Sequence, residues 1–354
     1  MSKSPTAFVV ALSLALICLI SFQSAGAAEK GVWTDPNDPT ISADFRLQGE
    51  FAGDKIGCQV IALGNDAFQA VVLPGGLPGA GWDGKKKIIL DGKIDGTKVA
   101  LASPKGNKKY LAQSPAEFSA TSKFPPVGQK DYSGTIEEGV LTLKTDEGQT
   151  LSLKRTVRES SALGAKAPAE AIVLFDGTST SEWNGGRVDE KTKLLNTDGK
   201  DITTKRKFSN YTAHVEFYLP FKPEGRGQGR GNSGFYQVHH YEVQILDSFG
   251  LDGKNNECGG VYTKLEPSVN MCLPPLQWQS YDIDFTNAVM ESGKKTKNAH
   301  ITAKHNGVSI HEDAEITGPT GGHRGDAEGT PGPLVLQGHG NPLQFRNIWV
   351  VEKK

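Results

Sequence analysis

Short stretches of alternating apolar and polar residues recur along most of the chain, and turns rich in glycine and proline separate them. In the clearest case, residues 300–311, two alternating segments meet at Asn306-Gly307, a strong signal for a β-hairpin. Alternation with a period of two is typical of strands, whereas helices need a period near 3.6. The 42 glycines and 19 prolines among 354 residues also disfavour long helices. The chain is therefore predicted to be all-β.

The balance of charges excludes two classes of partner. Lys and Arg number 39 against 40 Asp and Glu, for a formal net charge of -1. A nucleic-acid binder or a protein that binds anionic membranes would show a basic excess, so neither partner is expected. The 37% hydrophobic content is enough for a folded core.

The first residues have the order of a secretory signal. Lys3 precedes the apolar run Phe8–Phe22, and small residues follow up to Ala27. The alternative is a membrane anchor, but this run is shorter than the roughly 20 residues that span a bilayer. We expect residues 1–27 to be a signal peptide, the mature protein to be periplasmic or extracellular, and no integral membrane segment to remain.

Two β modules are predicted after the signal. Residues 28–158 read as a small antiparallel barrel or sandwich, with strands at 45–51, 59–63, 68–73, 98–101, 139–143 and 151–157. Its Lys85-Lys86-Lys87 run is interpreted as a solvated hairpin end. Residues 159–170 are small, polar and non-periodic, as linkers are. Residues 171–354 are predicted to form a two-sheet jelly roll, with strands at 211–219, 281–285, 334–337 and 345–351.

Three cysteines would remain after export. Cys58 precedes an apolar run and is predicted to be a small buried strand residue. Cys258 and Cys272 lie in one irregular region, and spacing alone leaves open whether they form a disulfide.

The segment Phe235–Leu246 is predicted to be one strand that carries the candidate site. Alternation places His240, Glu242 and Gln244 on one face and the more apolar residues on the other. Such a face could present acid, base and hydrogen-bonding groups to one sugar. The alternative is the ordinary solvated face of an antiparallel sheet.

The preceding loop, residues 229–234, fits the spacing G-x-G-x-x-G. It leads into a strand rather than a helix, so a dinucleotide site is excluded by context. We interpret it as a loop at the rim of the sheet, from which Asn232 contacts substrate.

A second polar segment, residues 337–342, combines glycines with His339 and Asn341. His339 is a candidate for proton transfer because the ordinary pKa of histidine lies near neutrality. Asn341 could bind substrate or could simply cap a turn. Arg346 on the last strand could orient a sugar hydroxyl or carbonyl, or could pair with a carboxylate at the surface.

The sequence contains neither an HExxH metal motif nor the ligand pattern of an EF-hand loop. No cofactor is expected, and a calcium ion is the alternative.

Five motifs in order resemble the 3-keto-disaccharide hydrolase domain family, and the resemblance covers residues 171–352. They are Leu174–Gly177 with Trp183, Arg230–Tyr236, Tyr241–Ser248, Trp278–Asp282, and Gly332–Pro342 with Phe345–Trp349. The resemblance implies a concanavalin A-like jelly roll that acts on oxidised sugars, and it favours Glu242 and Gln244 as site residues. The first module resembles only the amino-terminal β extension of some secreted members.

A ketone at C3 acidifies the hydrogen at C2, so one base and one enolate stabiliser suffice to expel the group at C1, after which water adds. Glu242 or His339 is the expected base, and Gln244, Asn341 or Arg346 could stabilise the oxyanion. The alternative function is a non-catalytic, lectin-like carbohydrate-binding protein. Residues 28–158 could also bind a partner at the cell surface.

Overall fold

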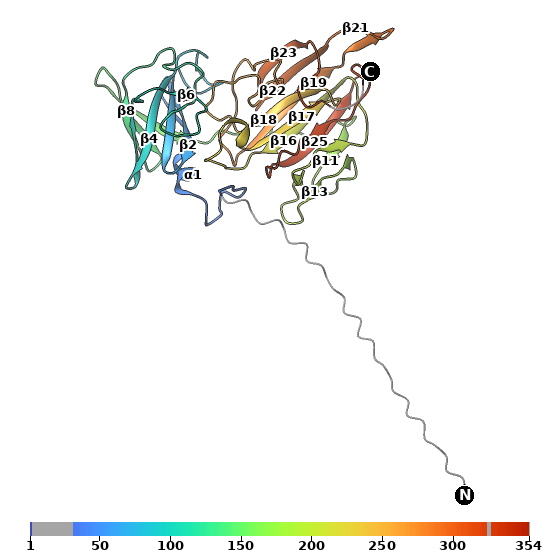
Figure 1. Cartoon of the computed structure of the whole chain (residues 1–354), viewed down its shortest axis with the longest axis horizontal. Helices are drawn as coiled ribbons and strands as arrows, with labels where there is room; N and C mark the ends of the chain where they lie inside the picture. Colours follow the sequence, from blue (N-terminus) through green and yellow to red (C-terminus); the bar gives the residue numbers. More distant parts are fainter. Residues whose placement is uncertain (2–30, 324–326, 354) are drawn as a thin grey trace. The chain divides into compact units, whose positions relative to one another are not determined.

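Antiparallel sheets make up nearly all of the regular structure in this computed structural model (Figure 1), with 44% of the residues in strands and 2% in helices. The prediction of an all-β fold is confirmed. The structure describes residues 1, 31–323 and 327–353. Apart from Met1, the predicted signal peptide lies outside the described residues. In the part that is described, no helix has both the length and the apolar character needed to cross a membrane.

Eight antiparallel strands close a barrel in the order β1-β10-β9-β8-β5-β4-β3-β2. Their bounds are β1 Gly49–Gly53, β2 Ile56–Gly64, β3 Ala67–Pro74, β4 Ile88–Asp95, β5 Lys98–Ala102, β8 Ser133–Glu137, β9 Val140–Lys144 and β10 Thr150–Thr156. The short strands β6 (Lys109–Tyr110) and β7 (Phe118–Ser119) form a parallel pair outside the barrel. Closure gives every barrel strand two neighbours, so the barrel has no open edge.

The predicted strand at 45–51 starts too early. The helix α1 (Ala43–Leu47) occupies its first residues, and β1 begins at Gly49. Tertiary packing explains the difference, because Phe45 lies against Phe221 with ring centroids 5.3 Å apart.

The second half is a sandwich of two sheets. The first has the order β13-β14-β25-β16-β19-β22-β23, with β11 pairing β25, and the second has the order β12-β15-β24-β17-β18. Bounds in the first sheet are β11 Ile172–Phe175, β13 Arg187–Val188, β14 Leu195–Asn196, β16 Tyr211–Tyr218, β19 Trp278–Thr286, β22 Ala299–His305, β23 Val308–Ile316 and β25 Gln344–Glu352. Those in the second are β12 Trp183–Asn184, β15 Ile202–Thr204, β17 Asn232–Gln237, β18 Tyr241–Leu246 and β24 Val335–Leu336. The strands β20 (Val289–Glu291) and β21 (Lys294–Lys297) form a separate hairpin.

Two hairpins show how local sequence sets the turns. The prediction at Asn306-Gly307 is confirmed, because both residues have positive φ, 52° and 81°, and join β22 to β23. The predicted single strand 235–246 is wrong: a turn divides it into β17 and β18. Val238 and His239 adopt φ of 44° and 69° there. A β-branched residue such as Val238 rarely takes positive φ, and no Gly, Asn, Asp or Pro marks the turn, so the sequence carried no clear turn signal.

The barrel and the sandwich share packing. Strand β2 is buried along its whole length. Its residues Cys58, Val60 and Ala62 belong to the barrel core, whereas Ile61 and Leu63 pack with the core between the two sheets. Residues from Gly31 onward accordingly form one compact unit. The division at 28–158, 159–170 and 171–354 stays a proposal.

Candidate functional site

Five polar side chains share the outer face of the second sheet. In β18, Tyr241, Val243 and Ile245 point into the core, so the residues between them point the opposite way. The register of β17 and β18 pairs Tyr236 with Glu242, and the backbone bond from Gln337 to Gly234 aligns the next strand. We call Asn232, Tyr236, Glu242, Gln244 and Gln337 the site face.

The site face is covered rather than solvated. Asn232 and Gln244 are each 1% exposed, and Glu242 is 3% exposed. A solvated sheet face would leave such side chains in water. Burying a carboxylate and several amides is costly unless hydrogen bonds satisfy them, which distinguishes this face from an ordinary strand exterior.

Gly234 makes room for the carboxylate of Glu242. A Cβ atom at position 234 would lie 2.2 Å from Oε1 of Glu242, closer than any real contact. Thr320 fixes the backbone beside it, because its Oγ1 accepts a hydrogen bond from Glu242 N at 2.9 Å and donates to His240 O at 3.1 Å. The position of Glu242 is therefore determined by its neighbouring strand and by a loop.

Gln228, from the 3-10 helix η1 (Gly227–Gly229), links the two amides of the site face. Its Oε1 accepts hydrogen bonds from Asn232 Nδ2 and Gln244 Nε2, both at 3.1 Å. The carbonyl oxygens Asn232 Oδ1 and Gln244 Oε1 are buried and have no hydrogen-bond partner in the described chain. Two acceptors are thus held in place for donors such as sugar hydroxyls.

Two further side chains complete this region. Tyr236 donates its hydroxyl hydrogen to Gly321 O at 3.2 Å and accepts from Gln337 Nε2 at 3.4 Å. His240 lies at the turn between β17 and β18, with its ring centroid 6.0 Å from that of His323. The structure thus places His240 beside the site face rather than on the strand.

His339 lies in the loop that follows β24 and is exposed. Asn341 is buried and donates a hydrogen bond from Nδ2 to His339 O at 3.0 Å. This bond is that of a turn, the alternative considered from the sequence. His339 lies two residues after Gln337, which is the last residue of this segment on the site face.

Arg346 is not brought together with Glu242. It lies on β25 in the first sheet, where Nε donates to Glu216 Oε2 at 2.6 Å and the guanidinium stacks over the Trp278 ring at 3.9 Å. One alternative considered from the sequence was an ion pair between Arg346 and a carboxylate, and the structure shows such a pair with Glu216.

Glu216 is the centre of a buried ionic cluster on the first sheet. Its side chain is 1% exposed and also accepts from Asn347 Nδ2 at 2.8 Å and Gly164 N at 2.6 Å. Burial alone would raise its pKa, but the hydrogen bonds, that from His214 foremost, lower it to about 2. The lowered pKa keeps this carboxylate ionised, and Glu216 lies on the first sheet, whereas the site face is on the second.

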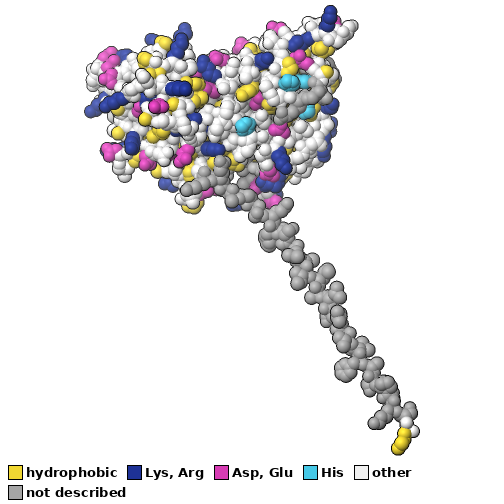
Figure 2. Space-filling view, in the orientation of Figure 1, with side chains coloured by type: hydrophobic (Ala, Val, Ile, Leu, Met, Phe, Trp, Pro, Cys, Tyr) yellow, Lys and Arg dark blue, Asp and Glu magenta, His cyan; other side chains and the backbone are white. Residues whose placement is uncertain are grey.

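Cys58 is buried in the barrel, as predicted, and all three described cysteines are free thiols. Within residues 31–323 and 327–353, no three His, Cys, Asp or Glu side chains gather as metal ligands would. The expectation of no cofactor and the calcium alternative both stay predictions. Figure 2 shows positive and negative side chains interspersed over the face in view.

Sequence reasoning missed Gln228, Tyr236 and Gln337. Alternation on β17 could have revealed Tyr236 once the strand was split at its turn. Gln228 had no such signal, because it acts from a loop through its hydrogen bonds.

The structure is a β-sandwich of jelly-roll type in which a buried carboxylate lies between amides on one sheet. Residues 170–351 match the model of the 3-keto-alpha-glucoside-1,2-lyase-like domain, and the chain belongs to this family. The resemblance predicted from the sequence is confirmed. Family membership supports a glycoside hydrolase-type enzyme.

The chain also aligns with solved structures over about half of its length. A protein from Parabacteroides distasonis ATCC 8503, described as a candidate glycosyl hydrolase, is 32% identical, with 53% of this chain and 85% of that chain covered and a TM-score of 0.48. A second protein of this description from the same organism is 19% identical, with 52% and 94% covered and a TM-score of 0.38. No curated protein matches the chain.

Proposed function

We propose that this protein is an exported enzyme that cleaves 3-keto-glycosides by removing the C2 proton, expelling the C1 group and adding water. The observation that carries the proposal is the burial of Glu242 on the site face, between amides whose carbonyl oxygens are unsatisfied in the described chain. The family to which the chain belongs is described as lyase-like at positions 1 and 2, in keeping with elimination.

Glu242 is the proposed base. A carboxylate that takes the C2 proton forms an enolate, whose electron pair then expels the aglycone at C1. General-base catalysis of this kind contributes about 10²- to 10⁴-fold to a rate. Among the described residues, the site face holds a single carboxylate, that of Glu242, whereas ordinary glycoside hydrolysis uses a facing pair. This arrangement favours elimination.

Asn232 and Gln244 are proposed to bind the sugar. Their free carbonyl oxygens accept from hydroxyl groups, and the second amide hydrogen of Gln244 is a donor for the developing oxyanion. The exposed His339 is proposed to be a proton donor to the leaving group, and the buried Asn341 to hold the turn that carries it. Arg346 lies in the other sheet, and we assign it to the Glu216 cluster rather than to substrate.

The test follows aglycone release from a 3-keto-glycoside and from its unoxidised parent, with and without a chelator. We expect release from the keto compound alone, and the chelator arm tests for a metal. Glu242→Gln should lose at least about 100-fold in kcat while its melting temperature stays unchanged. Glu312→Gln is the matched control, since Glu312 is exposed on β23. Glycan binding without release from either compound would instead support the lectin-like alternative.

Export to the periplasm or the extracellular space is likewise our proposal, based on residues 1–27. Cell fractionation of the full chain and of a form lacking residues 2–27 tests it. A cell-surface partner for residues 28–158 is a separate proposal, which pull-down from intact cells would test.

A further inference from the structure

The loop formed by residues 247–265, here called the covering loop, pairs with the strand that carries Glu242. Gln244 N donates to Gly260 O at 2.9 Å, Gly259 N donates to Gln244 O at 3.0 Å, and Tyr262 N donates to Glu242 O at 3.0 Å. The loop thus runs along the outer edge of β18 as an additional strand would. Movement of the loop would shift Glu242 and Gln244 with it.

The covering loop also reaches the amides of the site face. Asn256 O accepts a hydrogen bond from Gln228 Nε2 at 2.7 Å. Gln228 in turn orients Asn232 and Gln244 through its own Oε1. Backbone groups of the loop therefore contact both the strand that carries Glu242 and the glutamine that orients the amides.

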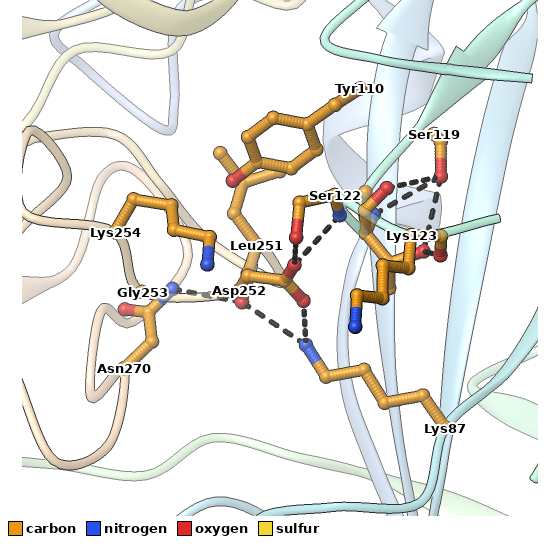
Figure 3. A network of polar contacts seen from close by, with 12 residues as sticks. Lys87, Tyr110, Ser119, Ser122, Lys123, Leu251, Asp252, Gly253, Lys254 and Asn270 are labelled. Atoms are coloured by element: carbon orange, nitrogen blue, oxygen red, sulfur yellow. Dashed lines mark hydrogen bonds and ion pairs between the residues drawn. The ribbon is translucent and has the colours of Figure 1, made fainter. Parts of the chain in front are cut away.

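The barrel holds the covering loop at Asp252. Lys87 Nζ lies 2.8 Å from Asp252 Oδ1, and Ser122 donates from both N and Oγ to Oδ2 at 2.7 Å (Figure 3). Burial would raise the pKa of Asp252, but the charge of Lys87 and the hydrogen bonds from Lys87 and Ser122 together outweigh it, and the pKa is lowered. Lys87 is 7% exposed, so the prediction of a solvated Lys85-Lys86-Lys87 run is wrong for Lys87.

A second anchor lies at Glu257. Tyr110, from β6 beside the barrel, donates its hydroxyl hydrogen to Glu257 Oε1. The other oxygen, Oε2, accepts from Gly253 N at 2.7 Å and Lys254 N at 2.9 Å, which closes the turn of the loop. Glu257 is 2% exposed, so water does not compete for these bonds.

The start of the loop is held as well. Arg230 donates from Nη2 to Ala62 O on barrel strand β2 at 2.6 Å and from Nη1 to Asp247 Oδ2 at 3.1 Å. The first module therefore contacts the loop directly at its middle, and Arg230 bridges the start of the loop to Ala62 of β2.

From these contacts we infer that the barrel, together with the segment that carries β6 and β7, is a positioning element for the active site. Lys87, Ser122 and Tyr110 fix the covering loop, and the loop fixes Glu242 and the amides. The inference rests on the proposed function for its catalytic consequence. It gives the first module a role that requires no partner.

The experiment compares wild type with the double variant Lys87→Met/Tyr110→Phe. Amide hydrogen exchange at residues 253–262 is measured together with kcat and KM for the 3-keto-glycoside. We expect exchange in this segment to accelerate about tenfold or more and kcat to fall about tenfold, with a smaller change in KM, because positioning acts on the reacting geometry.

Lys108→Met is the matched control. Lys108 pairs with Asp91 of barrel strand β4, and its ammonium group touches no residue of the covering loop. This variant should change neither exchange at 253–262 nor kcat. Rescue supplies a second control, because Asp252→Asn keeps an acceptor for Lys87 and should retain more activity than Asp252→Ala.

Two results would overturn the inference: unchanged exchange in the double variant, or faster exchange with unchanged kcat. If the double variant unfolds, Tyr110→Phe alone removes one hydroxyl and repeats the comparison. If wild type releases no aglycone, the proposed function fails, and the exchange measurement still decides whether the barrel holds the loop.

Discussion

Replacing Glu216 with Gln should destabilise the protein without touching the site face. The carboxylate accepts from Arg346 Nε at 2.6 Å, Asn347 Nδ2 at 2.8 Å and Gly164 N at 2.6 Å. An amide of the same shape offers only one oxygen and leaves the guanidinium without its counter-charge. The variant therefore tests whether this cluster is a structural anchor.

The size of the loss follows from burial. Breaking a buried ion pair costs about 3–5 kcal/mol, and since Arg346 is 38% exposed, the lower end of this range applies. The lowered pKa gives a similar figure, because a fall from 4.5 to about 2 corresponds to about 3 kcal/mol. At about 2–4 °C per kcal/mol, the melting temperature should fall by about 6–12 °C.

Urea unfolding of wild type, Glu216→Gln and the control Glu312→Gln at pH 7 measures this loss. A depressed pKa in the folded state stabilises above the unfolded value, so the difference is complete above pH 4.5 and shrinks as the pH falls toward about 2. A loss under about 1 kcal/mol at pH 7, typical of a surface pair, would refute the reasoning. So would a loss that stays constant down to pH 3.

Two further predictions follow. Burial acts to lower the pKa of His214, but the hydrogen bonds and charges of Asp282 and Glu216 together outweigh it, and the pKa is raised. The stabilisation by His214 is complete below pH 6.5 and is lost as the pH rises through the folded value. His214→Asn should therefore flatten the decline of the unfolding free energy above pH 6.5, and an unchanged pH profile would contradict this. Gly234→Ala should displace Glu242 and lower kcat about tenfold or more. Gly229→Ala is the control and should leave kcat unchanged, because a Cβ atom there would meet nothing within 4 Å. Equal kinetics of the two variants would contradict the placement of Glu242.

The sequence predicted what depends on local periodicity. Alternation in β18 was enough to place Glu242 and Gln244 on one face, and Asn306-Gly307 was enough to fix a hairpin. The turn at Val238-His239 was missed because the β-branched Val238 disfavours positive φ and no Gly, Asn, Asp or Pro marks the turn. Tertiary contacts impose that conformation, and no window of a few residues reports them.

Long-range pairing explains the other differences. The sequence could not show that Arg346 meets Glu216 or that Lys87 meets Asp252, since these partners are 130 and 165 positions apart. It could not show that Gln228 orients the amides of the site face either. Such contacts depend on how whole strands are arranged, and they decide which of several plausible polar residues share a site.

Strand β18 is the last strand of its sheet, and such a strand normally exposes backbone groups that can pair with another molecule. The bonds from Gly259, Gly260 and Tyr262 occupy that edge. The contacts that hold β18 therefore also protect the protein from edge-to-edge aggregation. Loosening the covering loop would then expose the edge of β18, so the contacts with the barrel support solubility as well as the proposed activity.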